Sequence, residues 1–231
     1  MRGIRLKIYG DRAHFKRPET NNNPCSYSYM HKIALLGFIG AVTGTERKTM
    51  SPLYPQLCED LLYSIRLLTP IIKESFGFTK RKTPAPNFYK QDRRYCEYLR
   101  DPSYEITVAI RNDRSANIFD TFCKNIKDGR SPYPTYFGVA NCPCVFEYIG
   151  DVTVSEEKTG EFSTDAIFSA EHKIVGDTDN LSLSFERVPT YSEDMYYHPD
   201  KMVQTVCVQG DTIKVCGAYR TISGDKTSWF M

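Results

Sequence analysis

HKIALLGFIGAVTG, residues 31–44, is the stretch on which the predicted fold depends. Its large apolar side chains recur at the spacing of a helix with one buried face, at Leu35, Leu36, Ile39 and Val42. Gly37, Gly40 and Gly44 recur at a similar spacing. Because glycine weakens a helix interior by about 1 kcal/mol relative to alanine, we expect these glycines to allow a close approach of the helix to a sheet.

Strands and a second helix are predicted on both sides of this helix. In residues 4–8, apolar side chains alternate with Arg5 and Lys7, which predicts a strand with one buried face and one basic face. Similar patterns predict the remaining elements, namely strands at 61–72, 104–111 and 145–154 and a helix at 117–127. The order strand, helix, strand, strand, helix, strand predicts an α+β protein with the ferredoxin-like βαββαβ arrangement.

The chain length allows one large domain or one domain with an elaborated half, since it has 231 residues. We predict a ferredoxin-like domain at 1–154 and a β-rich extension at 155–231 that packs on it. Within the extension, residues 201–220 have the pattern of a hairpin that turns at Gly210 and Asp211.

Charge and composition limit the classes of function. The net charge is only +2, so a nucleic-acid surface would require local clusters of basic residues. The longest apolar run, residues 33–42, is too short to cross a bilayer, and the first ten residues lack a signal peptide's apolar core. We therefore expect a cytoplasmic protein without membrane contact, whose eight cysteines are reduced thiols.

The first basic cluster lies in GDRAHFKRPETNNN, residues 10–23, and just after it. Charged residues and hydrogen-bonding groups of the kind that contact phosphates and bases are concentrated here, next to the basic face of the first strand. The candidate RNA-binding residues are Arg5, Lys7, Arg12, His14, Lys16, Arg17, Asn22, Ser26, Tyr27 and Ser28. For any one of these residues, a plain solvated loop remains the alternative.

A second basic cluster lies at 80–100, where aromatic residues are interleaved with arginine and lysine. Pro84 and Pro86 indicate a turn, so we predict an extended arm or hairpin. Such an arm suits an RNA backbone and its unstacked bases, although a solubilising hairpin has the same composition. The candidate RNA-binding residues here are Lys80, Arg81, Lys82, Lys90, Arg93 and Arg94.

A nuclease is the alternative to a binding protein. His14, Tyr29, His31 and Lys32 are of residue types that can transfer protons. The sequence does not place them together, and His31 also fits the start of the helix. HExxH, GxSxG and carboxylate spacings typical of metal sites are absent from the sequence, so we predict no metal and no cofactor.

Four stretches, in the same order and at similar spacing, resemble the Cas five family of the RAMP superfamily, whose members are CRISPR-associated subunits of type I Cascade complexes. The stretches are IRLKIYGDRAHFKRPE, SYSYMHKIALLGFIGAVTG, EYLRDPSYEITVAIR and SPYPTYFGVANCPCVFEYIGDV. They cover about the first two thirds of the chain and are most similar to type I-B subunits. The resemblance implies a ferredoxin-like (RRM-like) domain, a projecting thumb and a variable β-rich C-terminal part.

The resemblance also implies partners. Members of the family hold the 5′ handle of the CRISPR RNA at one end of the complex. They pack against a Cas seven-type backbone subunit and a Cas eight-type large subunit, and the guide RNA of the assembled complex pairs with target DNA. In this chain the arm, at about 75–103, would be the thumb, and residues 10–23 would lie beside the handle.

One branch of the family, in type I-C systems, cleaves the CRISPR RNA precursor. It uses a tyrosine near the end of the first helix and a Lys-His pair after the third strand. Here Thr43 falls about where the tyrosine would be, and NDRSANIFD, after Arg111, contains no Lys-His pair. We therefore expect a non-catalytic RNA-binding subunit, with a metal-independent endoribonuclease of the CRISPR repeat as the alternative.

Overall fold

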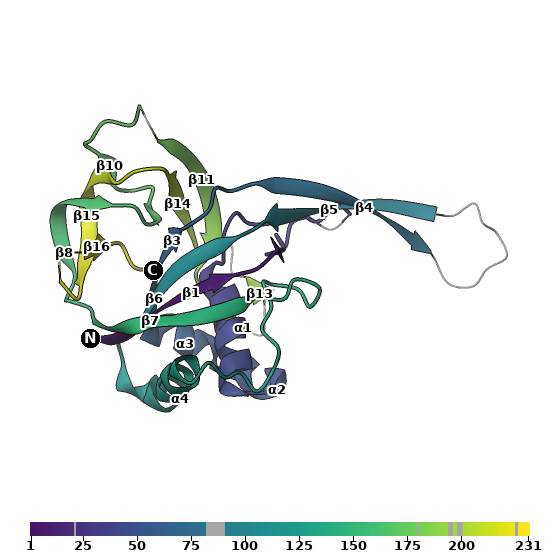
Figure 1. The fold of residues 1–231 in the computed structure, drawn as a ribbon, viewed down its shortest axis with the longest axis horizontal. Coiled ribbons are helices and arrows are strands. Elements are labelled where there is room, and N and C mark those ends of the chain that lie inside the picture. Colours follow the sequence, from purple (N-terminus) through teal and green to yellow (C-terminus); the bar gives the residue numbers. More distant parts are fainter. Residues whose placement is uncertain (21, 82–90, 180, 194–195, 198–200, 225) are drawn as a thin grey trace.

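The computed structural model describes residues 1–20, 22–81, 91–179, 181–193, 196–197, 201–224 and 226–231. Figure 1 shows a body of sheets and helices from which one long hairpin projects. The central sheet has four antiparallel strands in the order β3 (Leu61–Leu67), β6 (Ser103–Ile110), β1 (Arg2–Tyr9) and β7 (Val145–Thr153). In β1, Ile4, Leu6 and Ile8 are fully buried and Arg5 and Lys7 are half-buried, which confirms the predicted two-faced strand.

Helices α1 (Lys32–Thr43) and α4 (Ala116–Lys127) cover the buried face of this sheet (Figure 1). Both predicted helices are thus confirmed to within two residues. The ring of His31 accepts a hydrogen bond from the N–H of Ala34 at the start of α1, and Gly44, with a φ of 71°, ends the helix. Three short segments without a counterpart in the prediction follow, namely α2 (Arg47–Met50), the 3₁₀ helix η1 (Ser51–Leu53) and α3 (Tyr54–Asp60).

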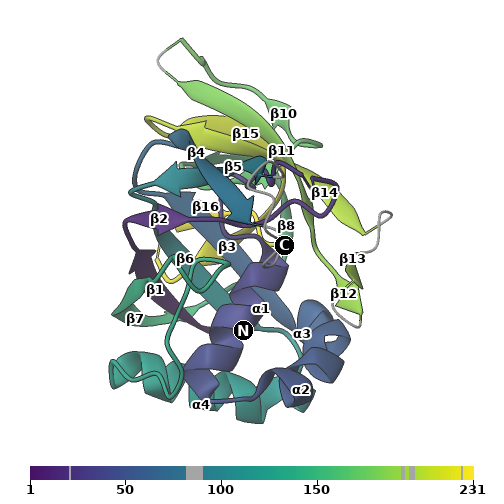
Figure 2. The same cartoon turned by 90° about the vertical axis from the view of Figure 1, so that its right-hand side faces the viewer.

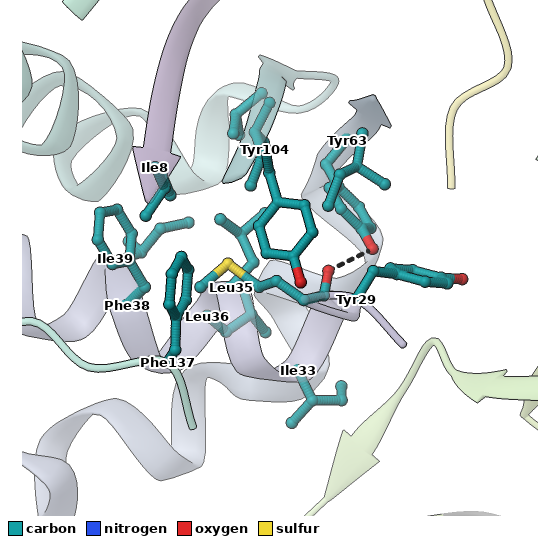
Figure 3. Close-up of a cluster of buried hydrophobic side chains, with 14 of the residues drawn as sticks. Ile8, Tyr29, Ile33, Leu35, Leu36, Phe38, Ile39, Tyr63, Tyr104 and Phe137 are labelled. Atoms are coloured by element: carbon teal, nitrogen blue, oxygen red, sulfur yellow. Dashed lines mark hydrogen bonds between the residues drawn. The ribbon is translucent and has the colours of Figure 1, made fainter. Parts of the chain in front are cut away.

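The core between α1 and the sheet is rich in aromatic side chains (Figure 3). Tyr63, Tyr104 and Phe137 are each at most 2% exposed. The hydroxyl of Tyr63 donates to the carbonyl of Met30, at 3.0 Å, so the segment that leads into α1 is fixed to β3.

The glycines of α1 do not face the sheet, contrary to the prediction. A Cβ on Gly40 would lie 3.2 Å from the Cγ of Met50, and a Cβ on Gly44 would lie 2.9 Å from Pro132. The close approach is therefore between α1 and the segments after it in the chain. Gly37 is exposed on the surface of the helix.

The projecting hairpin consists of β4 (Lys73–Arg81) and β5 (Gln91–Arg100), and it confirms the predicted arm, whose expected turn at Pro84 and Pro86 lies outside the described residues (Figure 1). The two-residue strand β2 (Arg12–Ala13) pairs with the base of β5. The strand predicted at 61–72 is too long, because β3 ends at Leu67 and the chain then turns into the hairpin.

The residues after 154 form small antiparallel sheets. Their strands are β8 (Lys158–Thr164), β9 (Phe168–Ser169), β10 (Lys173–Ile174), β11 (Ser182–Pro189), β12 (Ser192–Glu193), β13 (Tyr196–Tyr197), β14 (Met202–Gln209), β15 (Ile213–Ile222) and β16 (Lys226–Ser228). Figure 2 shows β10, β11 and β15 at one end of the molecule and the helices at the other. The core is continuous between the two parts, since Ile167, Val188 and Cys207 belong to the same cluster as the side chains of β1 and α1.

The prediction of a hairpin at 201–220 is wrong. Its two strands exist as β14 and β15, but β14 pairs with β11 and β9, whereas β15 pairs with β8, β10 and β16. The chain therefore passes from one sheet to another at Gly210 and Asp211 and does not fold back on itself.

The two edges of the central sheet differ. At the β3 edge, Tyr63 exchanges two backbone hydrogen bonds with Met231, of 3.1 and 3.0 Å, and the N–H of Ile167 donates to the carbonyl of Ile65 at 2.9 Å. At the other edge, no strand in the described part of the chain pairs with the outer side of β7, and only its last residue, Thr153, accepts a backbone hydrogen bond there, of 2.8 Å from Ser223. Along β7, Val145, Tyr148 and Ile149 are 40–54% exposed.

Of the helices in the described ranges, none is long and apolar enough to cross a membrane.

Candidate nucleic-acid interface

Residues 10–28, here called the basic loop, connect β1 with the segment that enters α1. Arg12, His14 and Lys16 point to one side of the loop, because residues two apart in extended chain share a face. The intervening Ala13 and Phe15 are at most 1% exposed and belong to the core. This alternation gives the loop a buried side that anchors it and a basic side.

The base of the hairpin holds the basic loop in place. Beyond the pairing of β2 with β5, the N–H of Glu97 donates to the carbonyl of Pro24 at 2.9 Å, and the N–H of Tyr95 donates to the side-chain oxygen of Asn23 at 3.1 Å. The two basic clusters, which are about 70 residues apart in the chain, therefore form one continuous surface.

One face of the hairpin carries aromatic rings beneath the basic loop. The guanidinium carbon of Arg12 lies 4.3 Å from the centre of the Phe76 ring, an arrangement that a cation–π interaction stabilises. The His14 ring lies 5.4 Å from the ring of Tyr98, which in turn is 6.5 Å from Phe78. Phe78 is 50% exposed, although large apolar side chains usually avoid water.

Arg94 lies on this same face, because it pairs with Phe78 in the strand register. The opposite face carries Arg93 and Tyr95, and the Tyr95 ring lies across Gly77. Arg93 is exposed and Arg94 is half-buried. Of the other candidates on the arm, the backbones of Lys80 and Arg81 lie at the end of β4, whereas Lys82 and Lys90 lie outside the described residues.

His14 is buried, in contrast to Arg12 and Lys16, which are exposed. Its Nδ1 donates to the carbonyl oxygen of Glu97 at 2.6 Å, since a carbonyl only accepts. Burial lowers the pKa of His14 below its ordinary value, so the ring is neutral near pH 7. His14 therefore packs the loop against the hairpin and contributes no positive charge to the surface.

Arg17 is held by a buried carboxylate from the C-terminal part. Its guanidinium forms an ion pair with Glu186 of β11, and its Cζ lies 5.2 Å from the centre of the Tyr27 ring. Glu186 is only 4% exposed. Its second carboxylate oxygen accepts hydrogen bonds from the N–H and the hydroxyl of Ser28. We call this group of Arg17, Ser28 and Glu186 the loop clamp.

Ser26 and Tyr27, predicted as RNA contacts, are also buried. The hydroxyl of Ser26 accepts from the N–H of Phe15 at 3.0 Å, and its own N–H donates to the carboxylate of Glu97 at 3.0 Å. Together with His14 and Ser28, these side chains stabilise the loop from inside and do not reach its surface. Asn22, by contrast, is exposed.

Arg5 and Lys7 lie on the sheet face opposite to the helices. Arg5 is 3.9 Å from the carboxylate of Glu105, which also pairs with Lys226 of β16 at 3.6 Å. The ammonium of Lys7 lies 4.7 Å from the centre of the Tyr9 ring. Glu105 thus partly neutralises the positive charge of this face.

The residues proposed for proton transfer are buried. His31 lies at the N-terminus of α1, and desolvation lowers its pKa to about 3. Burial raises the pKa of Tyr29, whose hydroxyl is hydrogen bonded to Thr205, and lowers that of Lys32 to about 8. The hydroxyl of Thr43 donates to the carbonyl of Ile39 within its own helix, at 2.9 Å.

The described residues contain no group of three or more His, Cys, Asp or Glu side chains that could hold a metal ion.

The sequence analysis did not predict the aromatic face of the hairpin or the two glutamates that bond to the basic loop. Phe76 and Phe78 are two residues apart on one strand, which is the alternation that would have indicated a shared face. Glu97 and Glu186 had no such signal, because each reaches the loop from a distant part of the chain. Ser26 and Glu97 are 71 residues apart, and Ser28 and Glu186 are 158 residues apart.

Comparisons with known proteins agree with this architecture. Residues 3–206 match the family model described as CRISPR-associated protein (Cas_Cas5). No match was found among curated proteins. The fold is similar to that of a CRISPR protein from Archaeoglobus fulgidus, with a TM-score of 0.57 and 15% identity over 98% of this chain and 97% of that one. It is also similar to a chain of a CRISPR RNA-guided surveillance complex, with a TM-score of 0.54 and 12% identity over 93% of this chain and 91% of that one.

Proposed function

Because the chain belongs to the Cas5 family of CRISPR-associated proteins, we propose that it is a non-catalytic subunit of a type I CRISPR interference complex (Cascade). In this proposal the subunit binds the 5′ handle of the CRISPR RNA and helps to assemble the complex for recognition of target DNA in antiviral defence. One observation carries it: the exposed cations Arg12 and Lys16 stand beside a hairpin whose Phe78 is exposed.

This combination suits single-stranded RNA. Cations placed along a projecting hairpin neutralise phosphates, and exposed aromatic rings offer faces on which unpaired bases stack. The chain itself carries a net charge of only +2, so the attraction would come from this local surface. The remaining exposed candidates in the described part of the chain are Asn22 and Arg93, with the half-buried Arg94 beside Phe78.

We assign the first 154 residues the ferredoxin-like arrangement, with the hairpin as its thumb and residues 155–231 as an extension. The strand order β3-β6-β1-β7 supports this assignment, as do the positions of α1 between β1 and β3 and of α4 between β6 and β7. The proposed neighbours are a Cas seven-type backbone subunit and a Cas eight-type large subunit, in the cytoplasm. The fold shared with a chain of an RNA-guided surveillance complex supports membership of such an assembly.

The burial of His14, Tyr29, His31 and Lys32 supports a binding role without catalysis. A general acid or base must come within hydrogen-bonding reach of the RNA atom that it protonates or deprotonates. Incubation of the purified chain with labelled repeat RNA in EDTA should therefore leave the RNA intact, whereas one defined cut would favour the endoribonuclease.

The binding surface is tested by reversing its exposed charges. The double variant Arg12→Glu, Lys16→Glu should bind guide RNA roughly 10- to 100-fold more weakly. The slope of log affinity against log salt concentration should also fall, by about 1.4, since each phosphate contact to a single strand contributes about 0.7. Fluorescence anisotropy at several salt concentrations measures both quantities. Arg17 is left intact, because its replacement would also disrupt the loop clamp.

The matched control is Lys158→Glu with Lys173→Glu, which makes the same charge change at two exposed positions in β8 and β10. Equal losses in the two double variants would indicate an effect of net charge only. Unchanged affinity of the Arg12, Lys16 variant would remove the basic loop from the RNA-binding surface.

A further inference from the structure

A groove lies beside the basic loop, between α1 and the segment 134–138. Its volume is about 330 Å³, which is within the range of small-molecule sites. Its walls include the buried Phe15 and Phe38 and the half-exposed Tyr136, and Lys16 of the basic loop also lines it. Gly37 and Gly138 also line it.

Gly37 has no packing reason to be glycine. It lies in the middle of α1, where glycine destabilises a helix relative to alanine. A Cβ at this position would meet only the hydroxyl of Tyr54 among the described residues, at an ordinary contact distance of 3.7 Å. By contrast, Gly40 is buried against Met50 and Gly44 ends the helix with a positive φ. What the missing side chain at position 37 provides is therefore open space in the groove.

The charge of the groove indicates the kind of molecule that it accepts. Lys16 is exposed and positively charged, and no carboxylate is among the described residues that line the groove. Tyr136 is 37% exposed, so part of its ring is open to contact. A flat ring that enters between apolar walls, attached to a phosphate within reach of a lysine, matches both features.

We propose that this groove binds one unpaired nucleobase of the RNA, with Lys16 holding a phosphate of the same strand. The inference rests on the proposed function and names a base-binding site within it. The open space over Gly37 admits the base, and the ring of Tyr136, which is 37% exposed, contacts its face. Phe76 and Phe78 are absent from the lining of the groove, so this site is separate from the aromatic face of the hairpin.

The test uses variants of Gly37 with opposite expected effects on stability and binding. Gly37→Ala should raise the midpoint of thermal unfolding by about 2–4 °C, because alanine favours a helix interior and its methyl group would meet no clash. The same methyl group should weaken RNA binding, because it takes up space in the groove. Gly37→Leu should fill the groove and weaken binding roughly tenfold, the loss expected for one stacked base. A purely structural glycine would show lower stability on replacement.

Two labelled probes separate the base from the phosphates. One is a 12-nucleotide single-stranded RNA of mixed sequence, and the other is an abasic sugar-phosphate oligomer of the same length. Gly37→Leu should weaken binding of the RNA and leave the affinity for the abasic oligomer unchanged, whereas Lys16→Glu should weaken both. The control Gly150→Leu adds the same side chain to open space on β7 and should leave both affinities unchanged.

The remaining outcomes contradict either the base-binding groove alone or the proposed function as well. If Gly37→Leu binds the RNA as tightly as the wild type does, the groove holds no base. If Gly37→Leu lowers the affinity for both probes equally, the groove does not bind a base. If the wild-type chain binds neither probe, the proposed function fails together with the groove.

Discussion

His31 stands where the basic loop becomes α1, and the rings of Tyr27 and Phe15 enclose it, with centroids 4.9 and 6.3 Å away. An imidazole in this position has to be neutral, because charging it would leave an ion without water. Its role is to accept the Ala34 N–H at the start of the helix, which is the role of an N-cap. A residue type suited to proton transfer therefore serves the fold here.

The burial of His31 makes the stability of the protein depend on pH. The folded-state pKa is lowered to about 3, whereas the unfolded chain binds a proton near its ordinary value of 6.5. The stabilisation is therefore complete above pH 6.5 and is lost as the pH falls, by about 1.4 kcal/mol per pH unit. His31→Asn, which keeps a capping side chain, should flatten the pH dependence by this amount in urea unfolding between pH 7 and 4. If the variant keeps the full slope, another group causes it.

At the scale of single elements, local patterns predicted what depends on local chemistry. The apolar periodicity of α1 and α4 and the alternation in β1 indicated these elements within two residues of their ends. Pairing is different, because the partner of a strand is set by distant strands. The Gly-Asp signal after β14 correctly indicated where that strand ends, yet the predicted hairpin turn is absent, because β15 pairs in another sheet.

The candidate site shows the same limit. The charges of the basic loop were visible in the sequence, but the burial of four of its predicted RNA contacts was not. That burial depends on Glu97 of β5 and Glu186 of β11, which meet the loop only in the folded chain. The sequence thus predicted which segment is basic, and the tertiary contacts decided which of its side chains face outward.

The loop clamp connects β11 to the basic loop and offers a test at this scale. Glu186→Ala should destabilise the protein by about 3 kcal/mol, because it leaves Arg17 without its acid and Ser28 without its acceptor. The loop should also be cut more readily by trypsin after Lys16, since the bond between Arg17 and Pro18 resists trypsin. Urea unfolding and limited proteolysis measure the two effects.

A double-mutant cycle supplies the control for the clamp. Arg17→Met combined with Glu186→Ala should destabilise less than the sum of the single variants, with a coupling of about 1–3 kcal/mol. Additive losses would mean that Arg17 and Glu186 act independently.

At the scale of the whole molecule, the C-terminal part completes the fold of the first part. Phe230 is buried against the sheet, and Met231 continues the hydrogen-bonding pattern of the sheet beyond β3. The Oγ atoms of Ser64 and Ser228, hydrogen bonded at 2.5 Å, add a further link between β3 and β16. The residues after 154 thus cover an edge that would otherwise be open.

Removing residues 229–231 tests this role. The truncated chain should lose about 3 kcal/mol or more of unfolding free energy and should self-associate with rising concentration, because an uncovered strand edge pairs with other chains. Phe230→Ala, which keeps the backbone of Met231, should lose similar stability and remain monomeric by light scattering. Self-association of both variants would show that instability, and not the open edge, is the cause.

The asymmetry of the two sheet edges gives the molecule a direction. The chain's own C-terminal residues occupy the β3 edge, while the outer side of β7 has no strand partner among the described residues. Within the central sheet, a further strand can therefore be added only beside β7, where Val145, Tyr148 and Ile149 are exposed. An assembly in which each subunit adds a strand to its neighbour's central sheet would therefore extend from this protein in one direction only.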